Sequence, residues 1–520
     1  MSIPLGPRTD RDARVVVVGA GFSGIGAAIR LRQQGFRDLL VLEKGAQLGG
    51  TWRDNTYPGC ACDVPSSLYS YSFAPNPGWS RTFAGQREIH DYLRSTADRH
   101  GVGDVLRCGV GVLRARWDRA AGRWHLETTD GEYRAAVLVL ATGPWHVPRR
   151  LDVPGLDAFP GPVFHTAEWD HSVDLSGRRV AVVGSGASAV QVVPAVQDRA
   201  AAVHLFQRTA QWVLPKPDFP VPRALSWCMK RIPGAQRAMR AGQYGVQEGF
   251  GYAFRHPHLV GPAQAMARAH LRLAVHDPVL RRALTPGYRL GCKRLLTSST
   301  FYPALNRPHV HLHPTAASAV RGRHVIGADG TGAEADVVID ATGFRIGELP
   351  LARGVYGTDG RSLHETWGES GPTAYLGTSV SGFPNLFLLL GPNLFSGSTS
   401  AITVLEAQLA YLSGAMTHLR QGRYAYLDVK PGAQADHNTA VQEALETTVY
   451  NTGGCSSYYF GAGGRNTFCW PWSTGRLVRR LSRFDPAAYT CSAPSAPVPA
   501  PRADRVSPTS EEGLPGGLPR

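Results

Sequence analysis

The run Val15-Val-Val-Val-Gly-Ala-Gly-Phe-Ser-Gly24 decides the fold of this 520-residue chain. An apolar strand enters a glycine-rich turn, an apolar helix follows over Ile25–Gln34, and a second strand ends at Glu43. In such a unit the glycines let the backbone and the helix N-terminus approach a pyrophosphate, while a carboxylate about 20 residues further on reaches a ribose hydroxyl. The pattern therefore predicts a dinucleotide site. Its predicted residues are Gly19, Gly21, Ser23, Gly24 and Glu43.

A second unit of the same kind follows in the middle of the chain. The apolar strand Arg179–Val183 enters the turn Gly184-Ser-Gly-Ala-Ser-Ala189, and the next strand is followed by Gln207-Arg208-Thr209 rather than by an acid. A carboxylate at this position would repel a ribose 2′-phosphate, whereas an arginine attracts it. We interpret this turn as an NADPH site and the first as an FAD site; alternatively, Arg208 is a solvated surface arginine. The predicted NADPH residues are Gly184, Ser185, Gly186, Ser188, Ala189, Arg208 and Thr209.

Length and hydropathy indicate a multidomain protein without a membrane span. Single hydrophobic cores stop growing near roughly 250–300 residues, so we expect two or three domains. The chain contains no run of about 18 apolar residues, which is the length that a helix needs to cross a bilayer. The N-terminus lacks the apolar segment of a signal peptide. These features predict a cytoplasmic location without stable membrane association.

Charge and cysteine usage exclude several other classes. The net charge of +15 would favour nucleic acid as a partner, but the basic residues between 221 and 294 are spread among alanine, glycine, proline and aromatics, and no nucleic-acid-binding motif accompanies them. We therefore expect no nucleic-acid partner. The eight cysteines are irregularly spaced, so we expect no disulfide framework and mostly free thiols. Cys60-x-Cys62 has no histidine cluster to complete a zinc site, so no metal site is predicted.

Two longer motifs narrow the function. Residues Gly49–Asp63 read Gly-Gly-Thr-Trp-Arg-Asp-Asn-Thr-Tyr-Pro-Gly-Cys-Ala-Cys-Asp, and Phe159–Asp170 read Phe-Pro-Gly-Pro-Val-Phe-His-Thr-Ala-Glu-Trp-Asp. Both fit the fingerprints of type I Baeyer–Villiger monooxygenases, and the chain resembles that family over about residues 12–489. The resemblance implies an enzyme that uses FAD, NADPH and O2 to insert one oxygen atom beside a ketone carbonyl, through a C4a-peroxyflavin, giving an ester or lactone.

The resemblance also assigns expected roles to residues outside the glycine turns. Asp63 would hold the guanidinium of Arg294 beside the flavin, where a fixed cation stabilises developing negative charge. Lys293 would reach the NADPH 2′-phosphate; the alternative is that Lys293-Arg294 is a solvated helix end. Tyr458 stands where the family commonly has Trp. Further expected FAD contacts are Thr51, Trp52 and Tyr69, and the expected hinge residues are His165 and Trp169.

The resemblance implies how the chain is divided. The apolar strands Val137–Gly143 and Asp336–Gly343 both end in Ala-Thr-Gly, which in the family marks the exit from each half of the FAD domain. The predicted fold class is therefore α/β, with two Rossmann-like dinucleotide-binding domains, the NADPH domain inserted in the FAD domain, and a helical insertion. The predicted limits are 1–147 and 335–490 for the FAD domain, 148–334 for the NADPH domain, about 221–290 for the helical insert, and 491–520 for a disordered tail.

Two other functions remain open at this level. One is a flavin monooxygenase that oxygenates nitrogen or sulfur. The other is a nucleotide-binding redox sensor without catalytic activity, although the combination of Asp63, Lys293 and Arg294 argues against it. The sequence does not predict which ketone is the substrate, nor the oligomeric state.

Overall fold

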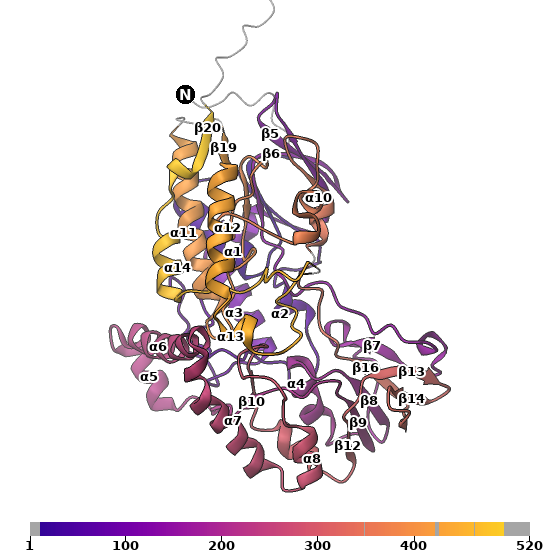
Figure 1. The fold of residues 1–520 in the computed structure, drawn as a ribbon. Helices are drawn as coiled ribbons and strands as arrows, with labels where there is room; N and C mark the ends of the chain where they lie inside the picture. The colour runs from indigo at the N-terminus through magenta and orange to yellow at the C-terminus, as the bar shows by residue number, and fades with distance from the viewer. Residues whose placement is uncertain (1–10, 348, 422–425, 462, 493–520) are drawn as a thin grey trace, which may run out of the picture.

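The computed structural model describes residues 11–347, 349–421, 426–461 and 463–492. The chain forms two α/β units, each built on its own sheet, and a group of helices projects from the second unit (Figure 1). The first unit contains the N-terminal strands together with the long C-terminal helices (Figure 1). The second unit is therefore inserted in the first, and the predicted α/β fold with two Rossmann-like units and a helical insertion is confirmed.

Strand β1 (Asp12–Val18) lies at the centre of the first sheet. It pairs in parallel with β2 (Leu39–Glu43) and β6 (Gly131–Leu140). Val15 and Val17 pack on one face of the sheet, whereas Val16 and Val18 pack on the other, which explains why every position of this segment is apolar. The strand order is β17-β4-β5-β6-β1-β2-β3, with β18 paired to β6. The other strands are β3 (Leu106–Cys108), β4 (Val112–Asp118), β5 (Arg123–Thr128), β17 (Val355–Tyr356) and β18 (Leu386–Leu388).

Three helices share one hydrophobic core with one face of the first sheet: α1 (Phe22–Gln33), α3 (Gln86–Arg99) and α11 (Ala401–Arg420). Helix α14 (Thr474–Leu481) packs into the same core through Leu477 and Leu481. The antiparallel strands β19 (Tyr426–Val429) and β20 (Tyr489–Ser492) follow α11 and α14 along the chain. Residues 491 and 492 of the predicted tail thus belong to a strand, and 493–520 lie outside the described residues.

The second sheet is parallel throughout, with the strand order β12-β9-β8-β16-β7. Helix α4 (Ala187–Val196) packs on one face of it. A small antiparallel sheet of β13 (Ala317–Arg321), β14 (His324–Gly327) and β15 (Gly332–Glu334) covers the other. The strands of the parallel sheet are β7 (Val163–His165), β8 (Arg179–Val183), β9 (Ala202–Phe206), β12 (Val310–His313) and β16 (Val337–Asp340).

The position of β16 corrects one prediction. This strand was expected to return the chain to the FAD domain, but it lies in the second sheet, between β8 and β7. An apolar strand ending in Ala-Thr-Gly indicates a buried parallel strand, yet it does not determine which sheet accepts it, because that depends on partners distant in sequence. The chain therefore leaves the second sheet only after Asp340. The other domain limits remain predictions.

The helical insertion leaves the second unit after β10 (Val213–Leu214) and returns at β11 (Leu296–Thr297), which pair in parallel. Phe254 anchors its longest helix, α6, in a core that also contains Cys292 and Tyr450. Within the described residues, no helix combines the length and apolar character needed to cross a membrane. The inserted helices are α5 (Arg223–Arg231), α6 (Ala235–Arg255), α7 (Gly261–Ala274) and α8 (Pro278–Ala283). The remaining helices are α2 (Thr51–Asp54), α9 (Phe301–Leu305), α10 (Leu363–Trp367), α12 (Pro431–Leu445) and α13 (Val449–Thr452).

Candidate active site

A cavity of about 1960 Å³ is lined by the first unit, the second unit and the helical insertion. Val246 and Met266 of the insertion line it and are also exposed at the surface, so the cavity opens beside α6 and α7. The predicted site residues that line the cavity are Thr51, Trp52, Asp63, Tyr69, Gly184, Ser185, Gly186, Ser188, Arg208, Thr209, Lys293 and Arg294. Those that do not line it are Gly19, Gly21, Ser23, Gly24, Glu43, His165, Trp169 and Ala189.

The first glycine turn is shaped by close backbone contacts. Gly19 has a φ of +104°, and a Cβ there would lie 2.7 Å from the carbonyl oxygen of Ala141. A Cβ at Gly24 would overlap the carbonyl oxygen of Gly19. Gly21 faces Gly50, whose Cα would lie 3.7 Å from an added Cβ. Side chains are therefore excluded at Gly19 and Gly24, and the bare backbone there suits the approach of a phosphate to the N-terminus of α1.

Glu43 lies beside this turn, at the end of β2, and is only 4% exposed. Its Oε2 accepts a hydrogen bond from Ala20 N at 2.8 Å. Its Oε1 accepts from Gly45 N and from Arg53 Nη1, both at 2.8 Å. A carboxylate offers about four lone-pair sites, so these bonds leave acceptor capacity for a ribose hydroxyl. The position and the free capacity of Glu43 fit the predicted nucleotide contact.

The second glycine turn opens into the cavity. A Cβ at Gly184 would overlap the carbonyl oxygen of Ala341, whereas a Cβ at Gly186 would meet no atom within 4 Å. Ser185 Oγ donates a hydrogen bond to the carbonyl of Thr209 at 2.8 Å, which ties the residue after Arg208 to the turn. The glycine turn therefore lies beside the polar residues that follow β9, which include Arg208 and Thr209.

Two cations meet beside this turn. Burial lowers the pKa of Lys293, and the nearby charge of Arg208 lowers it further. In the described part of the chain, neither side chain forms an ion pair with a carboxylate. Two neighbouring cations without a carboxylate partner among the described residues form a site for an anion such as a phosphate.

Asp63 and Arg294 form an ion pair on the cavity wall. Arg294 Nε donates to Asp63 Oδ2 at 3.0 Å, and Nη2 donates to Oδ1 at 2.9 Å and to Oδ2 at 2.7 Å. The guanidinium also lies 5.5 Å from the centre of the Trp145 ring. Asp63 raises the pKa of Arg294, so this cation stays charged at every physiological pH. The expected partnership of the two residues is present in the structure.

Two further side chains, one on α4 and one in the segment after β10, bind the same segment of the first unit, and sequence reasoning missed both. Gln191 of α4 accepts a hydrogen bond from the Tyr57 hydroxyl at 2.8 Å and donates to the carbonyl of Ala61 at 2.9 Å. Lys216 Nζ donates to the carbonyl of Cys62 at 3.0 Å. With Arg294, they bind four residues of the segment 57–63: Tyr57, Ala61, Cys62 and Asp63. Neither residue belongs to a recognisable motif, so nothing in the sequence pattern distinguished them.

Lys216 is an unusual member of this set because its ammonium is largely desolvated. It lies 4.9 Å from the centre of the Phe83 ring. Burial lowers the pKa of Lys216, and this outweighs the nearby negative charges of Asp218 and Asp63, which raise it. Like Lys293, Lys216 is therefore a cavity cation whose charged form is destabilised by burial in the folded protein.

His165 and Trp169 lie away from the Asp63–Arg294 pair. His165 is 1% exposed, and its Nδ1 accepts a hydrogen bond from Ala167 N at 3.0 Å. Desolvation lowers the pKa of His165, so the ring is neutral and Nε2 carries its hydrogen. Trp169 packs edge-on against Phe164 at 5.0 Å. His165 does not line the cavity, and its buried, neutral imidazole suits a structural role better than proton transfer.

The surroundings of His165 contain both crossings between the two units. Pro148 forms a β-bridge with Phe344, and Arg149 N donates to the carbonyl of Gly343 at 2.8 Å. The His165 ring packs edge-on against Phe344 at 5.8 Å. The outgoing and returning chains thus lie side by side against His165, an arrangement that suits the predicted hinge role without testing it.

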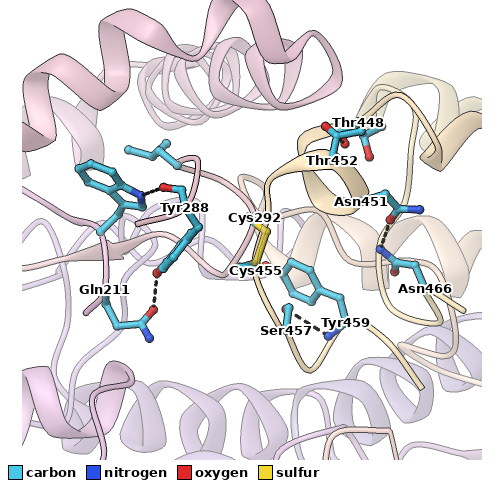
Figure 2. The surroundings of a disulfide bond; sticks show 12 residues. Gln211, Tyr288, Cys292, Thr448, Asn451, Thr452, Cys455, Ser457, Tyr459 and Asn466 are labelled. Carbon is cyan, nitrogen blue, oxygen red and sulfur yellow. Dashed lines mark hydrogen bonds between the residues drawn. A yellow bond between two sulfur atoms is a disulfide. The ribbon is translucent and has the colours of Figure 1, made fainter. Parts of the chain in front are cut away.

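A disulfide joins Cys292 to Cys455, with the Cα atoms 6.2 Å apart (Figure 2). The sequence did not predict it, because the cysteines are 163 positions apart and spacing alone indicates no pairing. Cys60 and Cys62 are free thiols. Burial raises the pKa of the Cys60 thiol to about 12 and raises that of Cys62 as well. These two thiols therefore stay protonated at neutral pH.

Comparison with known proteins agrees with this geometry. Residues 16–232 match a family model described as pyridine nucleotide-disulphide oxidoreductase, which defines the class of the fold. A Baeyer–Villiger monooxygenase of Streptomyces coelicolor is 47% identical over 93% of both chains. One of Pseudomonas aeruginosa is 40% identical over 94% of this chain and 93% of its own. The chain belongs to the Baeyer–Villiger monooxygenase family, as its two fingerprints predicted.

Solved structures show the same fold. An oxidised steroid monooxygenase bound to NADP superimposes with a TM-score of 0.81 at 28% identity, covering 93% of this chain and 100% of its own. A cyclohexanone monooxygenase from Rhodococcus sp. Phi1 bound to NADP+ gives a TM-score of 0.82 at 25% identity with the same coverage. The two-unit arrangement therefore extends over nearly the whole chain.

Gly24→Ala is expected to destabilise the protein, because the added Cβ would overlap the backbone of Gly19 and overpacking costs about 1–3 kcal/mol. Gly186→Ala is the matched control, since its Cβ would meet no atom within 4 Å. Thermal unfolding followed by circular dichroism compares the two variants. Equal melting temperatures for both would contradict this account of the first turn.

Lys216→Met is expected to change how stability depends on pH. The folded pKa of Lys216 lies below its unfolded value of about 10.4, so the wild type gains stability as pH rises through the folded pKa towards the unfolded one. The melting temperature of the Met variant relative to wild type should therefore fall between pH 7 and pH 10, by on the order of 2 °C. Lys216→Arg, which stays charged, is the control. A difference independent of pH would exclude desolvation of Lys216 as the cause.

Proposed function

We propose that this protein is an NADPH- and O2-dependent monooxygenase that uses FAD to insert one oxygen atom beside a ketone carbonyl, giving an ester or lactone. The observation that carries the proposal is the Asp63–Arg294 ion pair on the wall of a cavity that also contains the second glycine turn. Membership of the Baeyer–Villiger family and the similarity to a monooxygenase bound to NADP support the same function.

The first unit has the features that FAD requires. Gly19, Gly21 and Gly24 leave the N-terminus of α1 open to a pyrophosphate, and Glu43 has acceptor capacity for a ribose hydroxyl. At the cavity wall, the hydroxyl of Thr399 is buried with no hydrogen-bond partner among the described residues. It precedes α11, whose N-terminus carries a partial positive charge. The further contacts proposed for FAD are Ser23, Thr51, Trp52 and Tyr69.

The second unit has the features that NADPH requires. The open space at Gly186 gives a pyrophosphate access to the N-terminus of α4. Arg208 and Lys293, which form no ion pair with a described carboxylate, would bind the 2′-phosphate together. We assign the same site to Gly184, Ser185, Ser188, Ala189 and Thr209.

Bound FAD would accept a hydride from NADPH and then activate O2. The chain's own contribution is the guanidinium of Arg294, which Asp63 keeps charged and fixed in direction by three hydrogen bonds. A preorganised cation stabilises negative charge that develops on oxygen during transfer to the ketone, an effect worth roughly 3–4 kcal/mol in the barrier. Because the cation is already oriented, no solvent has to reorganise when that charge appears.

Arg294→Ala should leave NADPH-dependent flavin reduction nearly unchanged and lower ester or lactone formation by about 100-fold or more, because only the later step develops charge beside Arg294. Stopped-flow absorbance measures reduction, and mass spectrometry measures products that gain one oxygen. Arg179→Ala is the control, since Arg179 forms a similar two-point pair with Asp336 outside the cavity. Normal product formation by the Arg294 variant would exclude its proposed role.

Product identity tests the reaction itself. Conversion of amines or thioethers without conversion of any ketone would assign the chain to nitrogen or sulfur oxygenation. Nucleotide binding with neither steady NADPH consumption nor any oxygenated product would favour the redox sensor.

Arg208→Ala should raise the KM for NADPH by about tenfold or more while the KM for NADH stays within about twofold, because only NADPH carries the 2′-phosphate. Steady-state oxidation of each coenzyme provides the measurement. Arg199→Ala, on the solvated surface of the same unit, is the matched control. If both KM values rose equally, Arg208 would not bind the 2′-phosphate.

A further inference from the structure

The disulfide between Cys292 and Cys455 connects the two segments that lie against Arg294. Cys292 directly precedes Lys293 and Arg294 in the sequence. Cys455 directly precedes residues 456–461, which line the cavity and include Tyr458. Figure 2 shows the bond between these segments, with the ring of Tyr459 beside it. A covalent bond thus joins the segment that carries the proposed catalytic cation to a second segment of the cavity wall.

The segment after α13 has little regular structure of its own. Gly453 and Gly454 precede Cys455, and Gly454 has a φ of +76°. Two adjacent glycines give a chain wide conformational freedom. On the N-terminal side, Arg289 N donates to the carbonyl of Gly453 at 2.9 Å. On the far side, Thr467 N donates to the carbonyl of Tyr459 at 3.0 Å. Between these two points, the disulfide is what attaches the segment to the helical insertion.

The packing around the bond is close on the Cys292 side and looser on the Cys455 side. Cys292 is 1% exposed and lies in one core with Tyr459 and Tyr450. A Cβ at Gly453 would overlap the side chain of Cys292. Cys455 is only half-buried. Opening the bond would therefore leave Cys292 in place and release mainly the segment that begins at Cys455.

Tyr458 is the residue on this segment most relevant to Arg294. It lines the cavity and is 39% exposed, and its ring packs edge-on against Tyr459 and Phe468. Its charge, when ionised, acts on Arg294, which places the two side chains in one electrostatic environment. A shift of the segment would move Tyr458 away from Arg294 and admit water to the ion pair.

We propose that Cys292 and Cys455 are positioning residues for oxygen transfer: their disulfide holds Tyr458 near Arg294 on the cavity wall, and its reduction releases residues 454–458 and uncouples NADPH consumption from oxygenation. This inference rests on the function proposed above. Reduction by a dithiol transfers two electrons and two protons to the bond, yielding two cysteine thiols and the cyclic disulfide of the reductant. Exchange with an oxidised dithiol reverses the reaction.

The test uses the FAD-loaded protein before and after reduction with dithiothreitol, which is removed before assay. Amide hydrogen exchange in peptides covering 453–461 should become about tenfold faster after reduction, while peptides covering 184–209 stay unchanged. Oxygenated product per NADPH oxidised should fall about threefold or more, because water then reaches the ion pair. Cys455→Ser should show both changes and should not respond to the dithiol.

The matched control is Cys108→Ser, which removes an exposed thiol on β3. It should behave as wild type in both the oxidised and the reduced state. If Cys455→Ser fails to fold, the reduced wild type still provides both measurements.

Two outcomes would overturn the inference. One is thiol titration that finds Cys292 and Cys455 free in the oxidised protein. The other is a reduced protein that melts at a lower temperature but keeps its exchange rates and its product per NADPH, since the disulfide would then contribute only stability. If no ketone were converted to an ester or lactone in any redox state, the proposed function would be refuted instead. The exchange rates would still show whether the Cys292–Cys455 disulfide holds the segment in place.

Discussion

The arrangement of the molecule depends on the contact between residues 57–63 of the first unit and three side chains from the second unit and its helical insertion. Arg294, Gln191 and Lys216 each form hydrogen bonds to this segment, and only Arg294 does so to a carboxylate. An ion pair that is partly shielded from water strengthens as water is excluded, but it requires both partners in fixed positions. The same contact therefore joins the units and orients the cation on which the proposed chemistry depends.

Local sequence patterns predicted the parts of the fold that are locally determined. Each glycine turn lies in a βαβ unit whose strands and helix follow one another closely in the sequence, so a short motif was enough to predict it. The position of β16 and the disulfide depend on residues more than a hundred positions apart. Spacing contains no information about such pairings, and the prediction for β16 was wrong for that reason.

In the candidate site, too, residues within recognisable motifs could be predicted and residues outside them could not. Asp63 and Arg294 could be predicted as partners because each belongs to a segment that resembles the family. Gln191 and Lys216 contact backbone carbonyls, and any donor of suitable length can make such contacts. A residue type that many positions share gives no signal in a single sequence. The buried ammonium of Lys216 became apparent only with its surroundings.

The pairing of β10 with β11 has a consequence for how this enzyme family diversifies. The helical insertion leaves and returns through these two strands, and its apolar side chains, such as Val246, border the mouth of the cavity. Changes in the length or composition of α5–α7 can therefore alter which molecules enter, while the strand pair keeps the return point of the chain in place. Arg294 lies beside β11 and not on these helices, so the mouth of the cavity can vary without displacing the cation on which the proposed chemistry depends.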